Sequence, residues 1–216
     1  MRGAEAPHAS CTACPRLAAF LAGGRVSHPG YYCRPVPAFG DSAPRLLIVG
    51  LAPGFHGANR TGRPFTGDYA GVLLYQTLHA FGYASRPESA SADDGLVLTG
   101  CRISNAVKCV PPENKPETAE IRRCNAYLRD EIAALPADTA LLALGLIAHK
   151  AVLMALGLKQ ADYAFGHGAV HRLNRRTLFD SYHCSRYNTQ TRRLTPEMFR
   201  AVFARIRDDV LAGAPA

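Results

Sequence analysis

The chain of 216 residues lacks the features of a membrane or a secreted protein. No apolar run approaches the ~18–20 residues that a membrane-spanning helix needs. Residues 1–10 lack the apolar core of a secretory signal, so we expect a cytoplasmic protein without a membrane partner. Neither an internal repeat nor a low-complexity linker divides the chain, which predicts one domain over residues 1–216.

Two common nucleotide-binding motifs are also missing from the glycine-rich stretch of residues 50–68. It has neither the GK[ST] ending of a phosphate-binding loop nor a GxGxxG pattern. Glycine lets backbone approach a ligand closely and proline stiffens the path, so this loop can present N–H groups to a carbonyl or an anion. An ordinary surface loop would have the same composition, and that alternative stays open.

What the chain does carry is positive charge. Its 25 lysines and arginines exceed its 17 aspartates and glutamates, which gives a net charge of +8. A surplus of this size fits a polyanionic partner such as nucleic acid. Many basic proteins bind nothing anionic, so charge alone does not decide.

Short apolar segments alternate with segments of helical spacing along the chain. We predict strands over residues 45–50, 96–107, 139–145 and 177–182, and helices over 68–81, 116–135, 146–156 and 195–211. This alternation predicts an α/β fold, a three-layer α/β/α sandwich with a central, mostly parallel four-stranded sheet. Ligands of such sheets bind at the carboxyl ends of the strands, which directs attention to the segments after Gly50, Val107 and Tyr182.

The sequence makes a more detailed prediction for three of these helices, beginning with the one over residues 68–81. In the first, Val72, Leu73, Leu74 and Leu78 form the apolar side. In the helix predicted over residues 116–135, Pro116 falls in the first turn. In the last predicted helix, Thr195 is the N-cap and Pro196 is the first helical residue.

The chain has seven cysteines, an odd number that argues against a disulfide framework. Cys11 and Cys14 form a CxxC pair, and Cys109 and Cys124 follow much later. Four sulfurs suit either zinc or a [4Fe–4S] cluster, while buried free thiols are the plain alternative. Cys33, Cys101 and Cys184 are left over, and Cys101 lies in an apolar strand as a core residue.

Several motifs in order resemble those of the iron–sulfur uracil-DNA glycosylases. Gly50-Leu-Ala-Pro-Gly54 with Gly62-Arg-Pro-Phe-Thr-Gly-Asp68 resembles their first motif. Asn105-Ala-Val-Lys-Cys-Val-Pro-Pro112 resembles their central segment, and Ser181-Tyr-His-Cys-Ser-Arg186 their His-Pro-Ser motif. Leu51 replaces the acidic residue of the sister family 4, so the resemblance favours family 5, the B-type enzymes.

The resemblance implies a monofunctional hydrolase of base-excision repair. Such an enzyme flips uracil out of DNA, hydrolyses its N-glycosidic bond and leaves an abasic site. Hypoxanthine and other deaminated or adducted bases are further expected substrates. The resemblance also implies that Cys11, Cys14, Cys109 and Cys124 hold a [4Fe–4S] cluster of structural role, and we expect a monomer associated with the nucleoid.

The same resemblance implies roles for individual residues around the base. The substrate-binding residues are Gly50, Leu51, Ala52, Pro53, Gly54, Phe65 and Asn105. Phe65 stacks on the flipped base, and the Asn105 amide reads uracil at N3 and O4. The neutral imidazole of His183 and backbone N–H groups of Leu51 to Gly54 stabilise the charge that develops on uracil O2. A strand-end turn for Asn105 and a structural role for His183 are the alternatives.

Asp68 is the nearest carboxylate that could orient the attacking water, because Leu51 cannot. Capping of the following helix explains an aspartate at this position equally well. Both roles stay open.

The polar, basic run after His183 resembles a loop that enters the DNA groove. Its expected DNA-binding residues are Ser185, Arg186, Asn188, Arg192 and Arg193, of which the arginines would meet phosphates. A solvated loop is the alternative. Cys184 stands where the family motif has proline, which makes the rigidity of this loop an open question. A cluster- or zinc-bearing nucleic-acid-binding module without catalysis is the remaining alternative for the whole chain.

Overall fold

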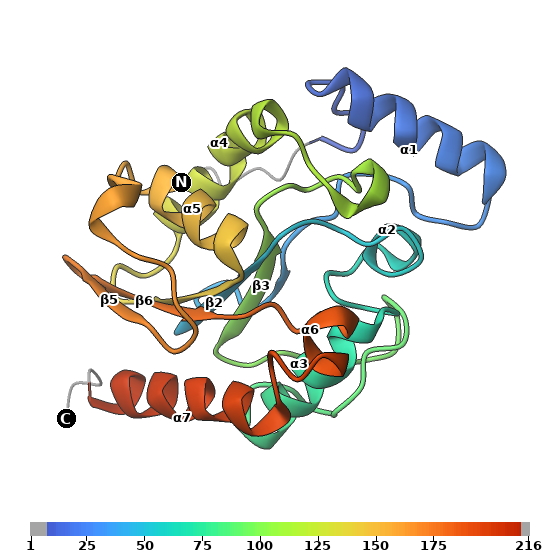
Figure 1. Cartoon of the computed structure of the whole chain (residues 1–216). Coiled ribbons are helices and arrows are strands. Elements are labelled where there is room, and N and C mark those ends of the chain that lie inside the picture. Colours follow the sequence, from blue (N-terminus) through green and yellow to red (C-terminus); the bar gives the residue numbers. More distant parts are fainter. Residues whose placement is uncertain (1–7, 213–216) are drawn as a thin grey trace.

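The computed structural model describes residues 8–212, which fold around a six-stranded sheet (Figure 1). In sheet order the strands are β1 (Phe39–Gly40), β3 (Cys101–Asn105), β2 (Leu46–Gly50), β4 (Ala140–Leu144), β6 (Arg176–Ser181) and β5 (Val170–Leu173). The four central strands are parallel, which confirms the predicted sheet. Strands β1 and β5 add antiparallel edges that the sequence did not predict.

Helices cover both faces of this sheet. They are α1 (Pro15–Ser27), α2 (Ala58–Thr61), α3 (Tyr69–Ala80), α4 (Thr118–Ala134), α5 (Leu146–Ala155), α6 (Arg186–Gln190) and α7 (Pro196–Ala212), with 3₁₀ turns η1 (Pro112–Asn114) and η2 (Gln160–Asp162). One apolar cluster joins α3 and α7 to one face of the sheet, and a second joins α4 and α5 to the other. The predicted three layers are therefore confirmed.

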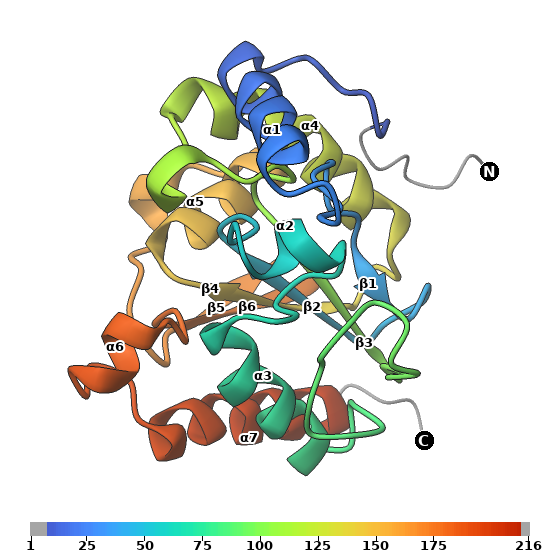
Figure 2. The same ribbon diagram turned by 90° about the vertical axis from the view of Figure 1, so that its right-hand side faces the viewer.

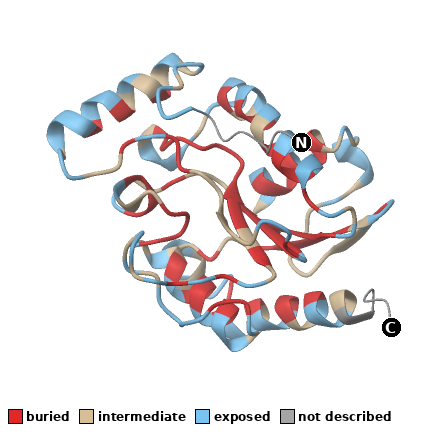
Figure 3. Cartoon of the chain, turned by 180° about the vertical axis from the view of Figure 1, so that it is seen from behind, coloured by how far each residue is buried: buried red, intermediate tan, exposed pale blue. Residues whose placement is uncertain are grey.

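The buried central strands explain why the sequence shows unbroken apolar runs. Strand β2 is buried along its whole length, and so is β4. Successive side chains point to opposite faces, so Leu46 and Ile48 join the α3–α7 cluster while Leu47 and Val49 join the α4–α5 cluster. Figure 3 shows this buried sheet between helices whose outer sides are exposed.

The predicted helices are present, with two corrections, one to a helix face and one to a helix end. Val72 is 53% exposed and does not belong to the apolar side of α3. Helix α4 begins at Thr118, because Glu117 is its N-cap and forms a capping box with Glu120; Pro116 lies before it. Thr195 does cap α7, since its Oγ1 accepts from Met198 N at 3.2 Å.

Two further segments differ from expectation. Strand β3 begins at Cys101 and not at residue 96, because Gly100 adopts a left-handed conformation with φ +65° just before it. Helix α1 was not predicted. It packs through Leu17 and Leu21 on a third apolar cluster, which includes Cys109 and Cys124.

The strand order places a crevice at the carboxyl end of β2. The chain leaves β2 for β3 on one side and later returns to β4 on the other, which makes this edge a topological switch point. Figure 2 faces this side of the molecule, with α2 near its centre, α1 above and α6 to one side. Among the described residues, no helix is long and apolar enough to cross a bilayer.

Candidate active site

A cavity of about 470 Å³ lies beyond the carboxyl ends of β2 and β3. Of the predicted site residues, it is lined by Leu51, Ala52, Gly54, Phe65, Asp68, Asn105, His183, Ser185 and Arg186. Gly50 and Pro53 do not line it: Pro53 is buried, and Gly50 ends β2 behind Phe65 and Asn105. The fold thus brings all three predicted motifs to one cavity.

Gly50 permits the close approach of two cavity side chains. A Cβ at this position would lie 2.5 Å from Asn105 Oδ1 and 2.6 Å from Phe65 Cζ, which is too close for either to remain. Phe65 itself has a left-handed backbone with φ +55°. Its ring is stacked on the His183 ring, with centroids 5.8 Å apart and planes at 27°.

Asn105 is 3% exposed, yet its Oδ1 has no hydrogen-bond partner among the described residues. Leaving such an acceptor unpaired costs roughly 1–3 kcal/mol. Because the side chain lines the cavity, a bound molecule with an N–H group can supply the missing partner. This orphaned amide oxygen is the clearest sign that the cavity binds a ligand.

His183 follows β6, is partly buried and stacks on Phe65. Burial lowers its pKa to about 4, so the imidazole is neutral at pH 7. Neither ring nitrogen bonds to another side chain or to backbone among residues 8–212, whereas the His183 carbonyl accepts from Asn188 Nδ2 at 2.8 Å. The ring therefore offers one free N–H donor to the cavity.

Asp68 performs the capping role and also faces the cavity. Its Oδ1 accepts from Gly71 N at 2.9 Å at the start of α3. A Cβ on Gly54 would lie 3.7 Å from Oδ2, and Gly54 lines the same cavity. Burial raises the pKa of this carboxyl, while hydrogen bonds from Gly71 and Ala70 oppose the shift.

The loop after β2 presents unpaired N–H groups. The Leu51 carbonyl accepts from Val107 N at 3.0 Å, and the Gly54 carbonyl accepts from Asn59 N at 3.0 Å. Within the described part of the chain, the N–H groups of Leu51, Ala52 and Gly54 donate no hydrogen bond. They are available to an oxygen atom in the cavity.

The expected DNA-contacting loop after His183 contains a short helix, α6, which corrects the prediction of an irregular loop. Ser185 caps it by accepting from Asn188 N at 3.4 Å. Arg186 stands 5.8 Å from the Tyr69 ring, and Arg193 4.6 Å from the Tyr182 ring. Arg186, Arg192 and Arg193 are exposed, whereas Asn188 is partly buried and bonds to the His183 carbonyl.

Cys184 takes the place of the motif's proline as an apolar residue. It is fully buried and belongs to the α3–α7 cluster. Next to it, the His183 carbonyl accepts from Asn188 Nδ2, so a buried neighbour and a hydrogen bond both hold this segment.

Cys11, Cys14, Cys109 and Cys124 come together between α1 and α4, where they line one pocket. No three of their sulfurs lie within 4.8 Å of one another, in the part of the chain that is described. A single zinc ion with bonds of ~2.3 Å needs ligand sulfurs only about 3.8 Å apart. The wider spacing is compatible with an iron–sulfur cluster.

The chemistry of this set also calls for a cationic group. Burial and the neighbouring thiols raise the pKa of Cys109 to about 12, and burial raises the pKa of Cys124. Four thiolates are stable together only when iron or another cation compensates their charge. The Lys108 N–H donates to Cys124 Sγ at 3.3 Å, a contact typical of a ligating sulfur's surroundings.

The sequence did not single out some residues that line the same cavity. They are Ala58, Tyr69, Ala70 and Asn114. Tyr187 of α6 is 70% exposed. Glu113 and Asn114 both have left-handed backbones in η1, and only the preceding Pro-Pro pair hinted at a tight turn.

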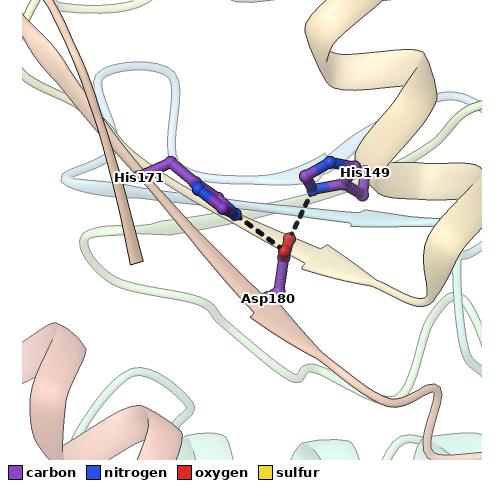
Figure 4. A group of neighbouring side chains, drawn as sticks. All are labelled: His149, His171 and Asp180. Atoms are coloured by element: carbon purple, nitrogen blue, oxygen red, sulfur yellow. Dashed lines mark hydrogen bonds and ion pairs between the residues drawn. The ribbon is translucent and has the colours of Figure 1, made fainter. Parts of the chain in front are cut away.

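A second cluster of titratable side chains lies outside this cavity (Figure 4). Asp180 of β6 is fully buried between His149 of α5 and His171 of β5. His149 Nδ1 contacts Asp180 Oδ1 at 2.8 Å, and His171 Nε2 contacts Oδ2 at 3.0 Å. Each histidine has its own carboxylate oxygen, which is a hydrogen-bonded arrangement.

The surroundings of His149 favour its cationic form. Its Nε2 contacts the Tyr163 carbonyl at 3.0 Å, so both ring nitrogens face acceptors and both must carry hydrogen. Burial alone would lower the His149 pKa, but the bond to Asp180 and its charge raise it. Both oxygens of Asp180 and both ring nitrogens of His149 are thus paired.

Comparison with known proteins identifies the family of this chain. Residues 37–207 match the Uracil DNA glycosylase superfamily. A Type-5 uracil-DNA glycosylase of Thermus thermophilus is 48% identical over 199 residues, which cover 89% of this chain and 90% of that protein. One of Pyrobaculum aerophilum is 41% identical over 204 residues, covering 93% and 89%. A Type-4 uracil-DNA glycosylase of Saccharolobus solfataricus is 28% identical over 174 residues, covering 77% and 74%. The resemblance to the B-type branch is thereby confirmed.

Proposed function

Because the chain belongs to the uracil DNA glycosylase superfamily, we propose that it excises uracil from DNA by hydrolysing the N-glycosidic bond. The observation that carries this proposal is the orphaned Asn105 Oδ1 in a cavity that also holds the free imidazole of His183. Hypoxanthine and other deaminated or adducted bases are proposed as further substrates.

The cavity accepts a base that has left the helix. Asn105 Oδ1 accepts from uracil N3–H, and its Nδ2 donates to O4. Phe65 offers its ring face to the base, supported from behind by Gly50. Cytosine presents an N3 acceptor and an N4 amino donor on this edge, so the pairing with Asn105 favours uracil over cytosine. Thymine has the same N3–H and O4 as uracil, so this pairing does not distinguish the two.

Cleavage moves the electron pair of the C1′–N1 bond onto the base, and negative charge develops on uracil O2. The N–H of neutral His183 and the N–H groups of Leu51, Ala52 and Gly54 donate to this oxygen. Each preset donor of this kind contributes ~3 kcal/mol to the transition state. The uracil anion leaves, and C1′ becomes cationic.

A water molecule then forms the new C1′–O bond. Asp68 Oδ2 orients this water and takes its proton, while Oδ1 continues to cap α3. A carboxylate also offsets the positive charge on the sugar. Lys108 is fully buried, and no lysine among residues 8–212 lines the cavity, so a Schiff base is not expected there and the strand stays intact.

We further propose that the four cysteines hold a [4Fe–4S] cluster. Its contribution when bound is structural, because hydrolysis transfers no electron. The cysteine site lies between α1 and the segment that follows Asn105, which links it to the cavity. Visible absorption with bound iron supports this assignment, whereas a colourless protein with bound zinc refutes it.

Ser185, Arg186, Arg192 and Arg193 would contact DNA phosphates beside the cavity. Three exposed arginines on one segment make binding strongly salt-dependent. Asn188 instead positions the His183 carbonyl.

The test is a duplex with one uracil, incubated with the protein and then treated with alkali. Alkali-dependent strand cleavage is expected with wild type. In His183→Ala, cleavage should be lost while DNA binding is kept. A wild-type protein that binds this DNA and releases no base would instead be a non-catalytic binding module.

A further inference from the structure

Lys108 forms a buried polar triad with Ser104 and Glu131. The lysine is fully buried, and Nζ lies 2.5 Å from Ser104 Oγ and 2.6 Å from Glu131 Oε2. Ser104 Oγ also donates to Glu131 Oε2 at 2.6 Å, which closes the triangle. We refer to these three residues as the lysine triad.

Stability alone does not explain such an arrangement. Moving an ammonium and a carboxylate out of water costs several kcal/mol each, and apolar side chains of similar volume often serve the fold as well or better. The triad lines neither the uracil cavity nor the cysteine pocket.

The placement of the triad suggests its purpose. Ser104 directly precedes Asn105 on β3, and Lys108 directly precedes Cys109. Glu131 lies seven residues after Cys124 on α4, two helical turns along the same face. The triad therefore joins the base-reading strand to the helix that carries a cysteine of the proposed cluster.

The backbone around Lys108 is held just as firmly. Its N–H donates to Cys124 Sγ at 3.3 Å, and its carbonyl accepts from Val36 N at 2.7 Å. Between the triad residues, Ala106 N donates to the Gly50 carbonyl at 2.9 Å and Val107 N to the Leu51 carbonyl at 3.0 Å. Segment 104–108 is thus fixed both to the cysteine site and to the loop after β2.

We propose that Lys108 is a positioning residue that sets the pose of the Asn105 amide through the lysine triad. Asn105 Oδ1 has no partner of its own to orient it, so its direction depends on the backbone that carries it. The triad clamps that backbone on both sides of Asn105. This inference rests on the proposed function, because it concerns how uracil is read.

The test uses a variant without the triad, Ser104→Ala/Lys108→Met/Glu131→Met, which leaves no buried polar group of the set unpaired. It is compared with wild type in two backgrounds, with Asn105 and with Asn105→Ala. Single-turnover rates, Tm, iron content and visible absorption are measured for each. Lys150→Met, which replaces an exposed lysine of α5, is the matched control.

Loss of the triad should slow uracil release by roughly 10- to 100-fold when Asn105 is present, because small misplacements of a reacting group have large effects. In the Asn105→Ala background the same change should cost less than about twofold, since coupled residues are not additive. Iron content and Tm should stay near wild type. Equal losses in both backgrounds, or no loss in either, would overturn the proposal.

Glu131→Gln provides a second route if the triple variant does not fold. It keeps the shape and hydrogen bonding of the side chain but removes its charge from the far side of the triad. A smaller loss that again disappears with Asn105→Ala is expected, and an additive loss refutes the role of Lys108. If wild type itself releases no uracil, the proposed function fails first and the positioning role fails with it.

Discussion

The cavity lined by Asn105 and His183 and the His149–Asp180–His171 cluster both gather polar side chains near the carboxyl ends of the strands, but they differ in how those groups are paired. In the cluster, each oxygen of Asp180 has a histidine partner, and His149 bonds on both sides of its ring. In the cavity, Asn105 Oδ1 has no partner and the ring of His183 is free among the residues described.

This difference separates a structural set from a functional one. Buried polar groups in folded proteins are normally satisfied, so a satisfied cluster needs no ligand to explain it. An unsatisfied amide beside an unsatisfied donor, in a cavity of about 470 Å³, implies that a substrate completes the bonding. Substitutions in the cluster should therefore act on stability, and substitutions in the cavity on catalysis.

The largest effect on stability is expected from Asp180→Ala. It removes the shared partner of two histidines and leaves the His149 cation buried without its counterion. The free energy of unfolding should fall by about 3–5 kcal/mol, measured by urea denaturation. Asp208→Ala, which removes an exposed carboxylate of α7, should change it little. Equal effects of the two changes on the free energy of unfolding would show that the His149–Asp180–His171 cluster does not stabilise the fold.

His183→Ala should lower the rate of catalysis and leave stability nearly unchanged. We expect kcat to fall by ~10²–10³-fold, because a donor to the developing oxyanion is lost, while Tm changes little. His79→Ala replaces an exposed histidine at the end of α3 and serves as the control. A His183→Ala protein that unfolds readily but keeps its rate when folded contradicts this assignment.

Asp68 has a structural role as the N-cap of α3 and a proposed catalytic role at the attacking water, and two substitutions separate these roles. Asn caps helices as well as Asp, so Asp68→Asn should keep α3 intact while removing the carboxylate. Asp68→Ala removes both and should lower stability by ~1 kcal/mol more. If Asp68 acts on the water, both variants lose about 10²-fold in kcat, and only the alanine variant is destabilised. A wild-type rate in Asp68→Asn would leave capping as its sole role.

A smaller effect concerns the pH dependence of stability. The folded-state pKa of His149 is raised above its ordinary value of 6.5 by Asp180, against the opposing effect of burial. The stabilisation from this histidine is therefore complete below about pH 6.5 and is lost as pH rises through the raised pKa. The difference in unfolding free energy between wild type and His149→Gln should shrink as pH rises above about 6.5. A difference that grows with pH has the wrong sign.

Much of this comparison could be predicted from the sequence where local pattern decides. Strands β2 and β4 are continuous apolar runs, and Gly50, Asn105 and His183 lie at or just after the carboxyl ends of β2, β3 and β6. Strand β1 was missed because it has only two residues. Strand β5, Val170–Leu173, was missed because its sequence does not alternate apolar and polar residues clearly. Helix α1 was missed because glycines interrupt it and only Leu17, Leu21 and Gly24 are buried.

The hydrogen-bonded networks around Asp180 and Lys108 could not be predicted, because their members come from elements that are far apart in the sequence. His149, His171 and Asp180 come from a helix and an antiparallel pair of strands, and no spacing in the sequence links them. Lys108 was visible only as part of a motif, and its buried contact with Glu131 arises where α4 packs on the sheet. The unpaired oxygen of Asn105 likewise required the packing of Gly50 and Phe65 around it.

The central claim is that the unpaired Oδ1 of Asn105 forms its hydrogen bond with uracil. The most direct measurement is the single-turnover rate of uracil release from duplex DNA, for wild type and Asn105→Ala, together with the Tm of each. We predict rapid release by wild type, a loss of about 10²-fold or more in the variant, and a Tm that does not fall because no bond within the protein is broken. An Asn105→Ala protein that releases uracil at the wild-type rate, or that is markedly less stable, would contradict the account.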